Sequence, residues 1–498
     1  MNSHQIPNEH HIKQQSLIRK LLMDRSQPGR IGAHIPQSDV PKQQQLPNKY
    51  LRKELPLPEV SESEIVRYFS QLSQFNFSID HNFYPLGSCT MKYNPKINDE
   101  IASLPGLSEI HPLQPEESIQ GALKIIFELQ NLLAEITGFD STSLAPMAGA
   151  EAELAGMLIT RSFHKNNGDT HKTKILITDS AHGTNPASAV MAGFDVISIP
   201  SDKNGNTDIE ALKAAINDDL AGLMLTQPST LGLFDTNIIE ICKRVKDAGG
   251  ILYGDGANLN ALLGRIKPGE LGFDILHSNL HKTFTQPHGG GGPGAGAIMV
   301  SKKLTPYLPS PIVQYSKDED FYSIYTPKKS IGRMGGFHGN FGALVRAYSY
   351  IKTLGKEGID QISKDAVINA NYIKSNLEEY FELPIKRICM HEVVFSASNF
   401  KKHNGIKALD ISKRLIDYGI HPPTMYFPLI IDEALMIEPT ETESKETLDY
   451  FISSMIKIAS EAKQDPELLR NAPHNTPNSR LDEALAARKP NLRWQKKD

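Results

Sequence analysis

Several features are scarce in this sequence, and each scarcity argues against a class of protein. Three cysteines, Cys89, Cys242 and Cys389, lie far apart and none forms a CxxC pair, so neither a disulfide framework nor a zinc site built from neighbouring residues is indicated. No window holds an apolar run long enough to span a membrane, and the first thirty residues lack the apolar segment of a signal peptide. We therefore expect a cytoplasmic protein with reduced thiols and no membrane partner.

An excess of charge of either sign is also missing. The sequence has 53 Lys and Arg against 57 Asp and Glu, a net charge of -4, and no basic run interleaved with aromatic residues. Nucleic acid is therefore not an expected partner. Hydrophobic residues make up 39% and charged residues 22% of the 498 residues, which is typical of a soluble globular protein with one large domain and a smaller one or extensions.

Composition and pattern divide the chain into three regions. Residues 1–110 are rich in Pro, Gln and charge and are expected to form an extended N-terminal arm, although the first fifteen residues could equally be disordered. Residues 111–340 alternate between helix and strand signals and are expected to form a large cofactor-binding α/β domain. Residues 341–498 are expected to form a smaller α+β domain with strands in EVVFSAS and ALMIEP, followed by a surface tail that contains the only tryptophan, Trp494.

Periodicity predicts individual elements. A helix is expected over 61–75, with Ser61 as its cap and Ile65, Tyr68 and Phe69 on one face, and an amphipathic helix is expected over 116–138, ending at Gly138. Short apolar runs predict buried strands at 174–178, 195–199, 222–226 and 251–255. Strands that alternate with helices indicate a parallel sheet covered on both faces, which binds ligands beyond the carboxyl ends of its strands.

One lysine lies in an unusual setting. The stretch NLHKTFTQPHGGGGPGAG, residues 279–296, places Lys282 in a short polar turn before a run of glycines that lets a ligand or another backbone approach closely. Lysine forms a Schiff base with a carbonyl cofactor and can release it again. Most lysines are solvated surface residues, so Lys282 alone does not establish a cofactor site. The Lys-Thr pair could also end a phosphate-binding P-loop, but the glycines that a P-loop needs upstream are absent.

Two further residues fit a pyridoxal phosphate site. Asp255 ends a predicted strand, where a carboxylate can pair with a protonated pyridine nitrogen, and His182 follows another strand and can lie flat against a planar ring. In isolation Asp255 is better explained as a turn or cap residue, and His182 as a hydrogen-bonded surface group. Together with Lys282 they indicate a pyridoxal phosphate enzyme.

The phosphate of such a cofactor needs donors. In PMAGAEAELAGML, residues 146–158, small residues precede a helical run, so free amides at a helix N-terminus could receive a dianion. Small residues before a helix are also common for packing reasons. The segment adds weak support to the cofactor reading.

Long motifs across the chain carry a family resemblance. They are FYPLGSCTMKYNP (83–95), IHPLQPEE (110–117), DGANLNALLG (255–264), HKTF with PHGGGGPGAG (281–296) and MIEPTETESKETLD (436–449). By these the chain resembles the P-protein family of the glycine cleavage system, glycine dehydrogenase (decarboxylating), in its two-subunit form and specifically the second subunit. The resemblance implies the pyridoxal phosphate-dependent transferase fold of the aspartate aminotransferase type, fold type I.

The resemblance also implies roles for individual residues. Lys282 would hold pyridoxal 5'-phosphate covalently, Asp255 would pair with the pyridinium and His182 would stack on the ring. The other expected cofactor contacts are Ala257, Gly149, Ala150, Glu151 and Thr230. Glu151 and Ser229 depart from the family pattern; a carboxylate beside a phosphate is unfavourable, so Glu151 is expected to act through its backbone only, and Thr230 is expected to take over a hydroxyl contact. No metal is expected.

The implied reaction is the decarboxylation of glycine. The carboxylate leaves as CO2, and the aminomethyl group passes to the lipoyl disulfide of the H-protein, which acts as the oxidant. The expected partners are glycine, glycine dehydrogenase subunit 1 in a dimer of heterodimers, the lipoylated H-protein and, indirectly, the T-protein and L-protein. His288 with the glycines after it is the candidate path for the lipoyl arm, and Cys89 in the GSCT loop is expected to be no nucleophile.

Two other readings remain open from the sequence. Another pyridoxal phosphate enzyme of the same fold, such as an amino-acid decarboxylase or a lyase, would have to explain why the glycine-rich loop and both terminal segments match the P-protein family. A non-catalytic scaffold would be favoured by loss of the cofactor lysine. Lys282 is present.

Overall fold

The computed structural model describes residues 20–41, 44, 46–53, 55–289 and 292–493. Trp494, Gly290, Gly291 and the first fifteen residues, on which predictions were made, lie outside them. The chain divides into two compact units, Met1–Ser78 and Ile79–Asp498. The boundaries at residues 110 and 340 remain a prediction.

The first unit has little regular structure among its described residues. Its elements are η1 (Leu22–Arg25), η2 (Asn48–Tyr50) and α2 (Glu62–Ser73). The predicted cap of α2 is confirmed: the Ser61 hydroxyl accepts from the Glu64 amide, and the Glu64 carboxylate accepts from the Ser61 amide at 2.9 Å. Tyr68 is buried as expected, but Phe69 is exposed, so the predicted apolar face is wrong at that position.

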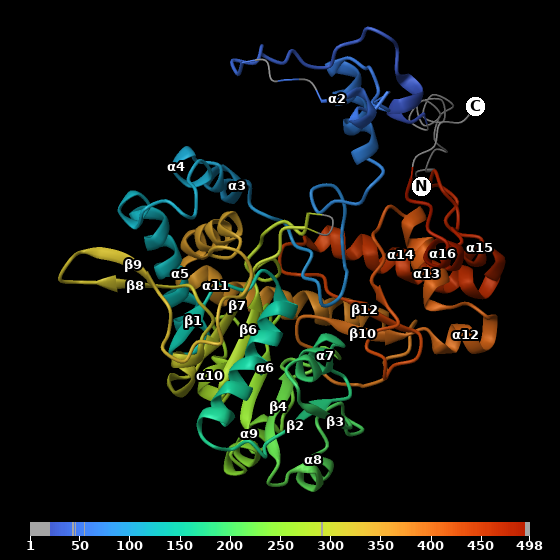
Figure 1. The fold of residues 1–498 in the computed structure, drawn as a ribbon. Coiled ribbons are helices and arrows are strands. Elements are labelled where there is room, and N and C mark those ends of the chain that lie inside the picture. Colours follow the sequence, from blue (N-terminus) through green and yellow to red (C-terminus); the bar gives the residue numbers. More distant parts are fainter. Residues whose placement is uncertain (1–19, 42–43, 45, 54, 290–291, 494–498) are drawn as a thin grey trace. The chain divides into compact units, whose positions relative to one another are not determined.

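A seven-stranded sheet organises the second unit (Figure 1). Its strands are β1 (Ser141–Ser143), β2 (Lys174–Thr178), β3 (Asp195–Ile199), β4 (Leu220–Thr226), β5 (Ile251–Asp255), β6 (Ile275–Asn279) and β7 (Gly296–Val300). They lie in the order β1-β7-β6-β5-β4-β2-β3, and only β7 runs antiparallel to its neighbours. The predicted parallel strands β2, β3 and β5 are confirmed at both ends, and β4 begins two residues earlier than predicted. The predicted burial is wrong for β3, which lies at the edge of the sheet and buries only Ile199.

Helices cover both faces of this sheet. Their bounds in the first part of the unit are α3 (Lys96–Ala102), α4 (Pro105–Ser108), η3 (Glu116–Ser118), α5 (Gln120–Thr137), α6 (Gly149–Asn166), α7 (Thr184–Met191), α8 (Ile209–Ala215), α9 (Ile238–Asp247), α10 (Pro268–Leu271) and η4 (Lys302–Tyr307). The predicted helix over 116–138 is observed as η3 and α5, and Gly138 ends it with φ 77°, a conformation that glycine adopts without strain.

Alternate strand residues face two different cores, as a parallel sheet buried on both faces requires. Leu176, Leu223 and Leu252 pack with apolar residues of α5 and α9. Ile175, Met224 and Tyr253 face the opposite side and pack with residues of α6 and α7. The helices therefore hold the sheet rigidly, with the loops after its strands free to form a site.

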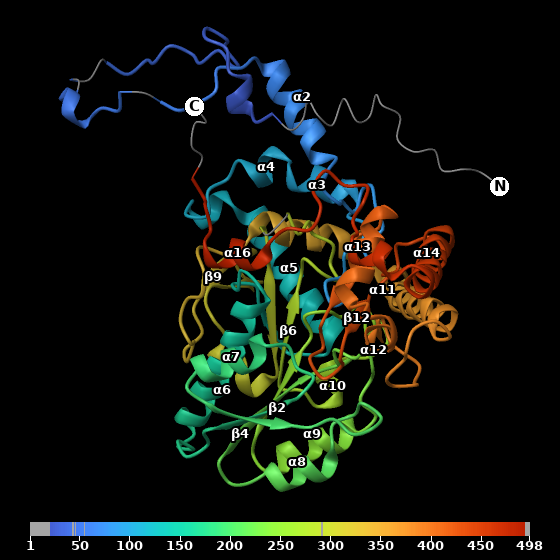
Figure 2. The same cartoon turned by 90° about the vertical axis from the view of Figure 1, so that its right-hand side faces the viewer.

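The C-terminal part forms a second core around a small sheet. Its elements are β8 (Ile312–Ser316), β9 (Phe321–Tyr325), α11 (Phe341–Leu377), β10 (Val393–Ser396), α12 (Ser398–Asn404), α13 (Ala408–Asp417), β11 (Thr424–Met425), β12 (Ala434–Ile437), α14 (Lys445–Gln464), α15 (Pro466–Arg470) and α16 (Glu483–Arg488). The sheet order is β10-β12-β11, with β8 and β9 forming a separate pair. The strands predicted in EVVFSAS and ALMIEP are β10 and β12. Figure 1 shows β10 and β12 among α12, α13 and α14, and Figure 2 shows β12 near the same helices.

The long helix α11 joins the two cores. Its first half buries Leu344 and Ile351 against the large sheet's core, and its second half buries Ile373 and Leu377 in the core of the small sheet. Gly355, at φ 60°, breaks the helix between the halves. The large sheet and the small sheet therefore both pack against α11.

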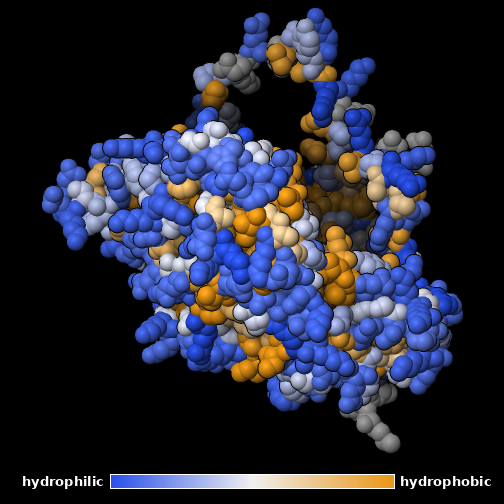
Figure 3. All heavy atoms as spheres, turned by 90° about the horizontal axis from the view of Figure 1, so that it is seen from below, coloured by the Kyte–Doolittle hydropathy of each residue, from blue (hydrophilic) through white to orange (hydrophobic). Residues whose placement is uncertain are grey.

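Polar and hydrophobic residues share the surface. The face shown in Figure 3 is largely hydrophilic, with hydrophobic residues in patches between. Within the described ranges, no helix combines the length and apolar character that crossing a membrane would need.

Candidate active site

A cavity of about 290 Å³ opens at the carboxyl ends of the parallel strands, where this class of sheet binds ligands. Loops after β2, β4, β5 and β6, the N-terminus of α6 and the segment before β10 surround it. Its lining residues are Ser88, Ala148, Gly149, Ala150, Glu153, His182, Thr184, Thr226, Pro228, Ser229, Thr230, Asp255, Ala257, Asn258, Asn279, His281, Lys282, His391 and Glu392.

Seven of the eight site residues expected from the sequence lie together in this lining; they are Lys282, Asp255, His182, Ala257, Gly149, Ala150 and Thr230. Glu151 is not among them. Its carboxylate turns back and accepts a hydrogen bond from the Met147 amide at 2.6 Å. Glu151 thus bonds to the segment before its own helix and lies outside the cavity lining, while the roles assigned to the other seven residues remain predictions.

Lys282 lies in a short turn directly after β6. Its amide donates to the Asn279 carbonyl at 3.0 Å, and the Thr285 amide donates back to the Lys282 carbonyl at 3.2 Å. The hydroxyl of Thr283, next in the chain, accepts from the Leu259 amide at 2.9 Å. The bond between Thr283 and Leu259 connects the turn that holds Lys282 to the loop after β5. Asp255 is the last residue of β5.

Asp255 is a buried carboxylate with several neutral or basic neighbours. Asn185 Nδ2 donates to it at 2.9 Å, the Ala257 amide donates at 3.0 Å, and His277 Nε2 lies 3.5 Å away. Burial acts to raise the pKa of Asp255, but these neighbours outweigh it and hold the pKa below its usual value. The carboxylate is therefore ionised where a protonated ring nitrogen would need an anion.

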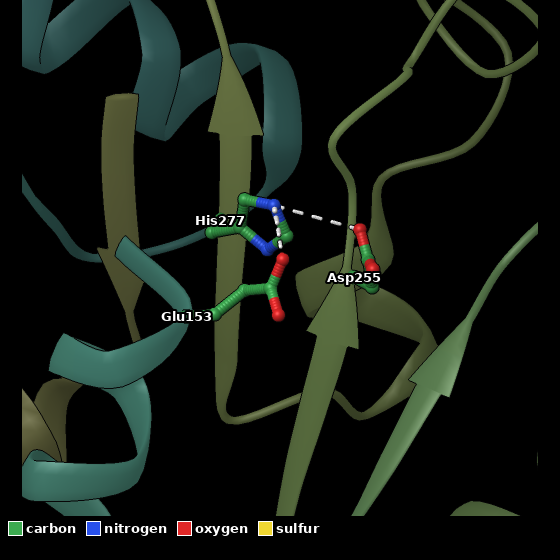
Figure 4. A group of neighbouring side chains, drawn as sticks. All are labelled: Glu153, Asp255 and His277. Carbon is green, nitrogen blue, oxygen red and sulfur yellow. Dashed lines mark ion pairs between the residues drawn. The ribbon is translucent and has the colours of Figure 1, made fainter. Parts of the chain in front are cut away.

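The buried residues His277 and Tyr253 fix the orientation around Asp255. The Tyr253 hydroxyl lies 2.6 Å from His277 Nδ1. Burial raises the pKa of Tyr253 well above its usual value, so the phenol keeps its proton and donates it to Nδ1. His277 then carries its hydrogen on Nε2, which faces Asp255 and Glu153 (Figure 4).

The first turn of α6 offers unpaired amides to the cavity. Gly149 and Ala150 begin this helix of 18 residues, and helix N-termini attract anions through free N–H groups and the helix dipole. A Cβ on Gly149 would lie 2.1 Å from Asn279 Oδ1. Asn279 Oδ1 is itself buried without a hydrogen-bond partner. The donors and the space at this end fit a phosphate group.

The side chains of His182 and Thr230 border the cavity from two loops. His182 Nδ1 lies 2.7 Å from the Thr184 hydroxyl, and loss of hydration lowers the pKa of this histidine. The Thr230 hydroxyl donates to the Ser180 carbonyl, so its hydrogen is used and its lone pairs remain as acceptors. Cys89 does not line the cavity, and burial raises the pKa of its thiol.

Sequence reasoning missed Glu392, which lines the cavity, and Glu438, a buried carboxyl beside it. The Ser88 amide donates to Glu392 at 2.7 Å, and Glu438 accepts from the amide and hydroxyl of Thr90, both at 2.9 Å. Both carboxyls are buried, and burial together with their mutual repulsion raises the pKa of Glu392 well above its usual value. No local motif marks Glu392, since only the tertiary fold brings it to the cavity.

Two histidines of the glycine-rich segment are paired. The rings of His281 and His288 meet edge to face with centroids 5.3 Å apart, and burial lowers the pKa of each to about 4. His281 lines the cavity, whereas His288 does not. Both rings are therefore neutral at physiological pH.

Comparison with known proteins gives this site a family context. Residues 12–326 match the family described as glycine cleavage system P-protein, and residues 362–476 match the glycine dehydrogenase C-terminal domain. A probable glycine dehydrogenase (decarboxylating) subunit 2 from Caldanaerobacter subterraneus is 56% identical, over 96% of this chain and 99% of its own length. The protein of the same name from Listeria monocytogenes is 54% identical, over 96% of this chain and 98% of its own. The chain belongs to the P-protein family of the glycine cleavage system.

Solved structures agree with the fold of a P-protein. A crystal structure of glycine decarboxylase (P-protein) in inhibitor-bound form matches with a TM-score of 0.69 at 18% identity, covering 92% of this chain and all of the other. Glutamate decarboxylase from Lactobacillus brevis matches with a TM-score of 0.62 at 16% identity, covering 87% of this chain and 96% of the other. This P-protein family member thus has the expected pyridoxal phosphate-dependent fold, fold type I.

Proposed function

We propose that this chain decarboxylates glycine with pyridoxal 5'-phosphate held on Lys282, and passes the aminomethyl group to the lipoyl arm of the H-protein. The observation that carries the proposal is the meeting of Lys282, Asp255, His182 and the free N-terminus of α6 around one cavity. Relatives more than 50% identical over nearly the whole chain are named for this activity. We also propose that the protein is located in the cytoplasm.

Each residue has a task that its position supports. Bound here, pyridoxal phosphate supplies an electron-poor ring that accepts the electron pair left by departing CO2. Lys282 holds the cofactor and releases it to the amine of glycine, Asp255 pairs with the ring nitrogen, and the amides of Gly149 and Ala150 receive the phosphate. Ala257 and Thr230 complete the contacts, and His182 lies against the ring.

The lining contains no arginine within the described chain, and Lys282 is its only lysine. A guanidinium would bind the carboxylate of the substrate in a bidentate pair and stabilise it as an anion. Without such a partner, the carboxylate is held weakly, which favours its loss as neutral CO2. The feature supports decarboxylation over reactions that must retain the carboxylate.

The proposal includes partners. Glycine dehydrogenase subunit 1 would complete the enzyme, and the lipoyl disulfide of the H-protein would accept the aminomethyl group as one S–S bond breaks and a C–S bond forms. The T-protein and L-protein would act on the H-protein afterwards. His288 and the adjoining glycines remain the candidate path for the lipoyl arm.

Isotope exchange tests the function. The chain, subunit 1, pyridoxal phosphate and lipoylated H-protein are expected to exchange labelled CO2 with the carboxyl of glycine, and to do so only when the H-protein is lipoylated. Lys282→Ala serves as the inactive control. Exchange into alanine or glutamate in place of glycine, or no exchange with every component present, would contradict the proposal.

A further inference from the structure

Glu153 is a buried carboxyl that the proposed function leaves without a task. It lies on α6, one turn into the helix, and only 4% of its surface is exposed. Thr184 Oγ1 lies 2.8 Å from its Oε1, and Asn185 Nδ2 donates to its Oε2 at 3.1 Å. Its closest basic group is Nε2 of neutral His277, at 3.9 Å. No lysine or arginine makes an ion pair with it in the described part of the chain.

Glu153 connects the two sides of the expected cofactor. Asn185 Nδ2 donates both to Glu153 and to Asp255, and His277 Nε2 faces both carboxyls (Figure 4). On the other side, Thr184 lies between Glu153 and His182. One carboxyl is therefore linked to the residue expected at the ring nitrogen and to the residue expected on the ring face.

The hydrogen atoms on the Thr184 side can be counted. The Thr184 hydroxyl has one hydrogen but two close partners, His182 Nδ1 at 2.7 Å and Glu153 Oε1 at 2.8 Å. The Thr184 hydroxyl can donate to only one of these partners, so the other partner must donate a hydrogen to the Thr184 oxygen. The Thr184 amide also points at His182 Nδ1 at 3.2 Å, which favours an Nδ1 without hydrogen. The missing hydrogen then belongs to Glu153.

Electrostatics agree with this count. Burial, and then repulsion from Asp255, raise the pKa of Glu153 to about 8, while hydrogen bonds from Thr184 and Asn185 and the charge of Lys282 act in the opposite direction. Asp255 has the lower pKa of the two. At neutral pH the pair therefore holds one proton, on Glu153, and one negative charge, on Asp255.

We propose that Glu153 is a positioning residue that stores a proton, leaves Asp255 as the single anion of the pair and, through Thr184, keeps His182 in the tautomer with hydrogen on Nε2. When Glu153 loses this proton, the hydrogen bonds reverse: its hydrogen passes to Thr184, that of Thr184 passes to His182 Nδ1, and the Nε2 hydrogen leaves into the cavity. One proton is released and no electrons are exchanged. The assignment of the ring face to His182 rests on the proposed function; the proton on Glu153 does not.

Unfolding of the cofactor-free chain tests the stored proton. Folded Glu153 keeps its proton between pH 4.5 and 8, whereas the unfolded residue has lost it, so wild-type stability falls as pH rises through this window. Glu153→Gln has no proton to lose. The ratio of the unfolding constants of wild type and variant is expected to grow with pH, by up to about tenfold per pH unit, and to level off above pH 8. Parallel curves from pH 5 to 9 would overturn the proposal.

Nitrogen NMR of histidine-labelled chain tests the tautomer. The His182 signal, identified by its loss in His182→Asn, is expected to report hydrogen on Nε2 at pH 7 in wild type and in Glu153→Gln, whose amide can still donate to Thr184. Thr184→Val breaks the connection and is expected to produce a mixture of tautomers. An unchanged His182 signal in Thr184→Val would overturn the relay even if Glu153→Gln failed to fold.

Glu443→Gln is the matched control. Burial raises the pKa of Glu443 to about 7, but this residue does not line the cavity. Its substitution is expected to change the pH dependence of unfolding and to leave the His182 signal as in wild type; a changed signal would contradict the local relay. The titration is expected to be the same in EDTA-treated and zinc-supplemented chain, and a difference between the two would overturn the stored proton. None of these measurements needs cofactor or glycine, so they can fail while the exchange assay succeeds, or the reverse.

Discussion

Lys92 Nζ lies 2.6 Å from Glu441 Oε1, and both side chains are almost fully buried, at 1% and 8% exposure. Lys92 also bonds to Asn260 and Tyr350, each at 3.2 Å, so all three hydrogens of its ammonium have partners. The pair joins the loop that carries Ser88 to the segment after β12. Because Ser88 lines the cavity, this ion pair holds one wall of the site in place.

Removal of one partner of this pair is expected to be costly. Lys92→Met leaves Glu441 buried without its cation and is expected to lower the free energy of unfolding by about 3 to 5 kcal/mol. The double variant Lys92→Met/Glu441→Gln should recover part of this loss. Denaturant unfolding measures both. The exposed pair Lys96–Asp80 is the control: Lys96→Met is expected to cost less than about 1 kcal/mol, and a cost for Lys92→Met in that same range would contradict the argument.

Gly149→Ala tests the end of the cavity expected to hold phosphate. The new Cβ would lie 2.1 Å from Asn279 Oδ1, so Asn279 or the start of α6 must shift. We expect affinity for pyridoxal phosphate to fall at least about tenfold, which corresponds to about 1.4 kcal/mol, as measured by equilibrium dialysis. Gly121→Ala, on α5 with nothing near its Cβ, should leave affinity unchanged and stabilise the helix slightly. Equal affinities in the two variants would argue against a phosphate at α6.

Asp255→Asn tests the anion expected at the ring nitrogen. An amide cannot stabilise a protonated pyridine, so exchange activity is expected to fall on the order of 100-fold or more while the chain still folds. Asp274→Asn is a suitable control because Asp274 is also a buried aspartate, bonded to the Leu252 amide and Lys303, but does not line the cavity. It should reduce stability without a comparable loss of activity per folded molecule. Similar activity losses in both variants would mean that Asp255 acts through the fold alone.

Three histidines with lowered pKa values, one buried and two half-buried, predict how stability falls at acid pH. Burial lowers the pKa of His281 and His288 to about 4 and that of His391 to about 3. Below pH 6.5 the unfolded chain takes up protons that the folded chain does not, so stability is expected to fall as pH drops from about 6.5 toward 4. Each unit by which folding lowers the pKa of a histidine corresponds to about 1.4 kcal/mol of stability lost at low pH. His391→Asn should make this fall less steep; an equally steep fall would show that His391 does not contribute.

The sequence predicted the central strands well because their signal is local. β2, β3 and β5 are short, mostly apolar runs between helical patterns, and this alternation predicts parallel strands joined by helical crossovers. β6 was missed because its sequence, ILHSN, contains three polar residues, all of them buried. One of them, His277, pairs with Tyr253, a partner that only the folded chain supplies.

The same distinction holds for the candidate site. Asp255 ends a recognisable strand, His182 follows another, and Lys282 stands out by its polar turn before a run of glycines, so their meeting could be anticipated. Glu153 had one local sign, a charged residue among the buried positions Ala152, Ala155 and Gly156 of α6. Glu392 comes from a segment more than a hundred residues beyond Lys282, and its position depends on how the small sheet packs against the loops of the large one.

The most direct test of the account is to trap the cofactor on its lysine. The chain is incubated with pyridoxal phosphate and subunit 1, reduced with borohydride, digested and mapped by mass spectrometry, with Lys282→Arg as the unlabelled control. The account predicts a visible Schiff-base absorption before reduction and a phosphopyridoxyl label on Lys282. A label on another lysine, or neither absorption nor label, would contradict it.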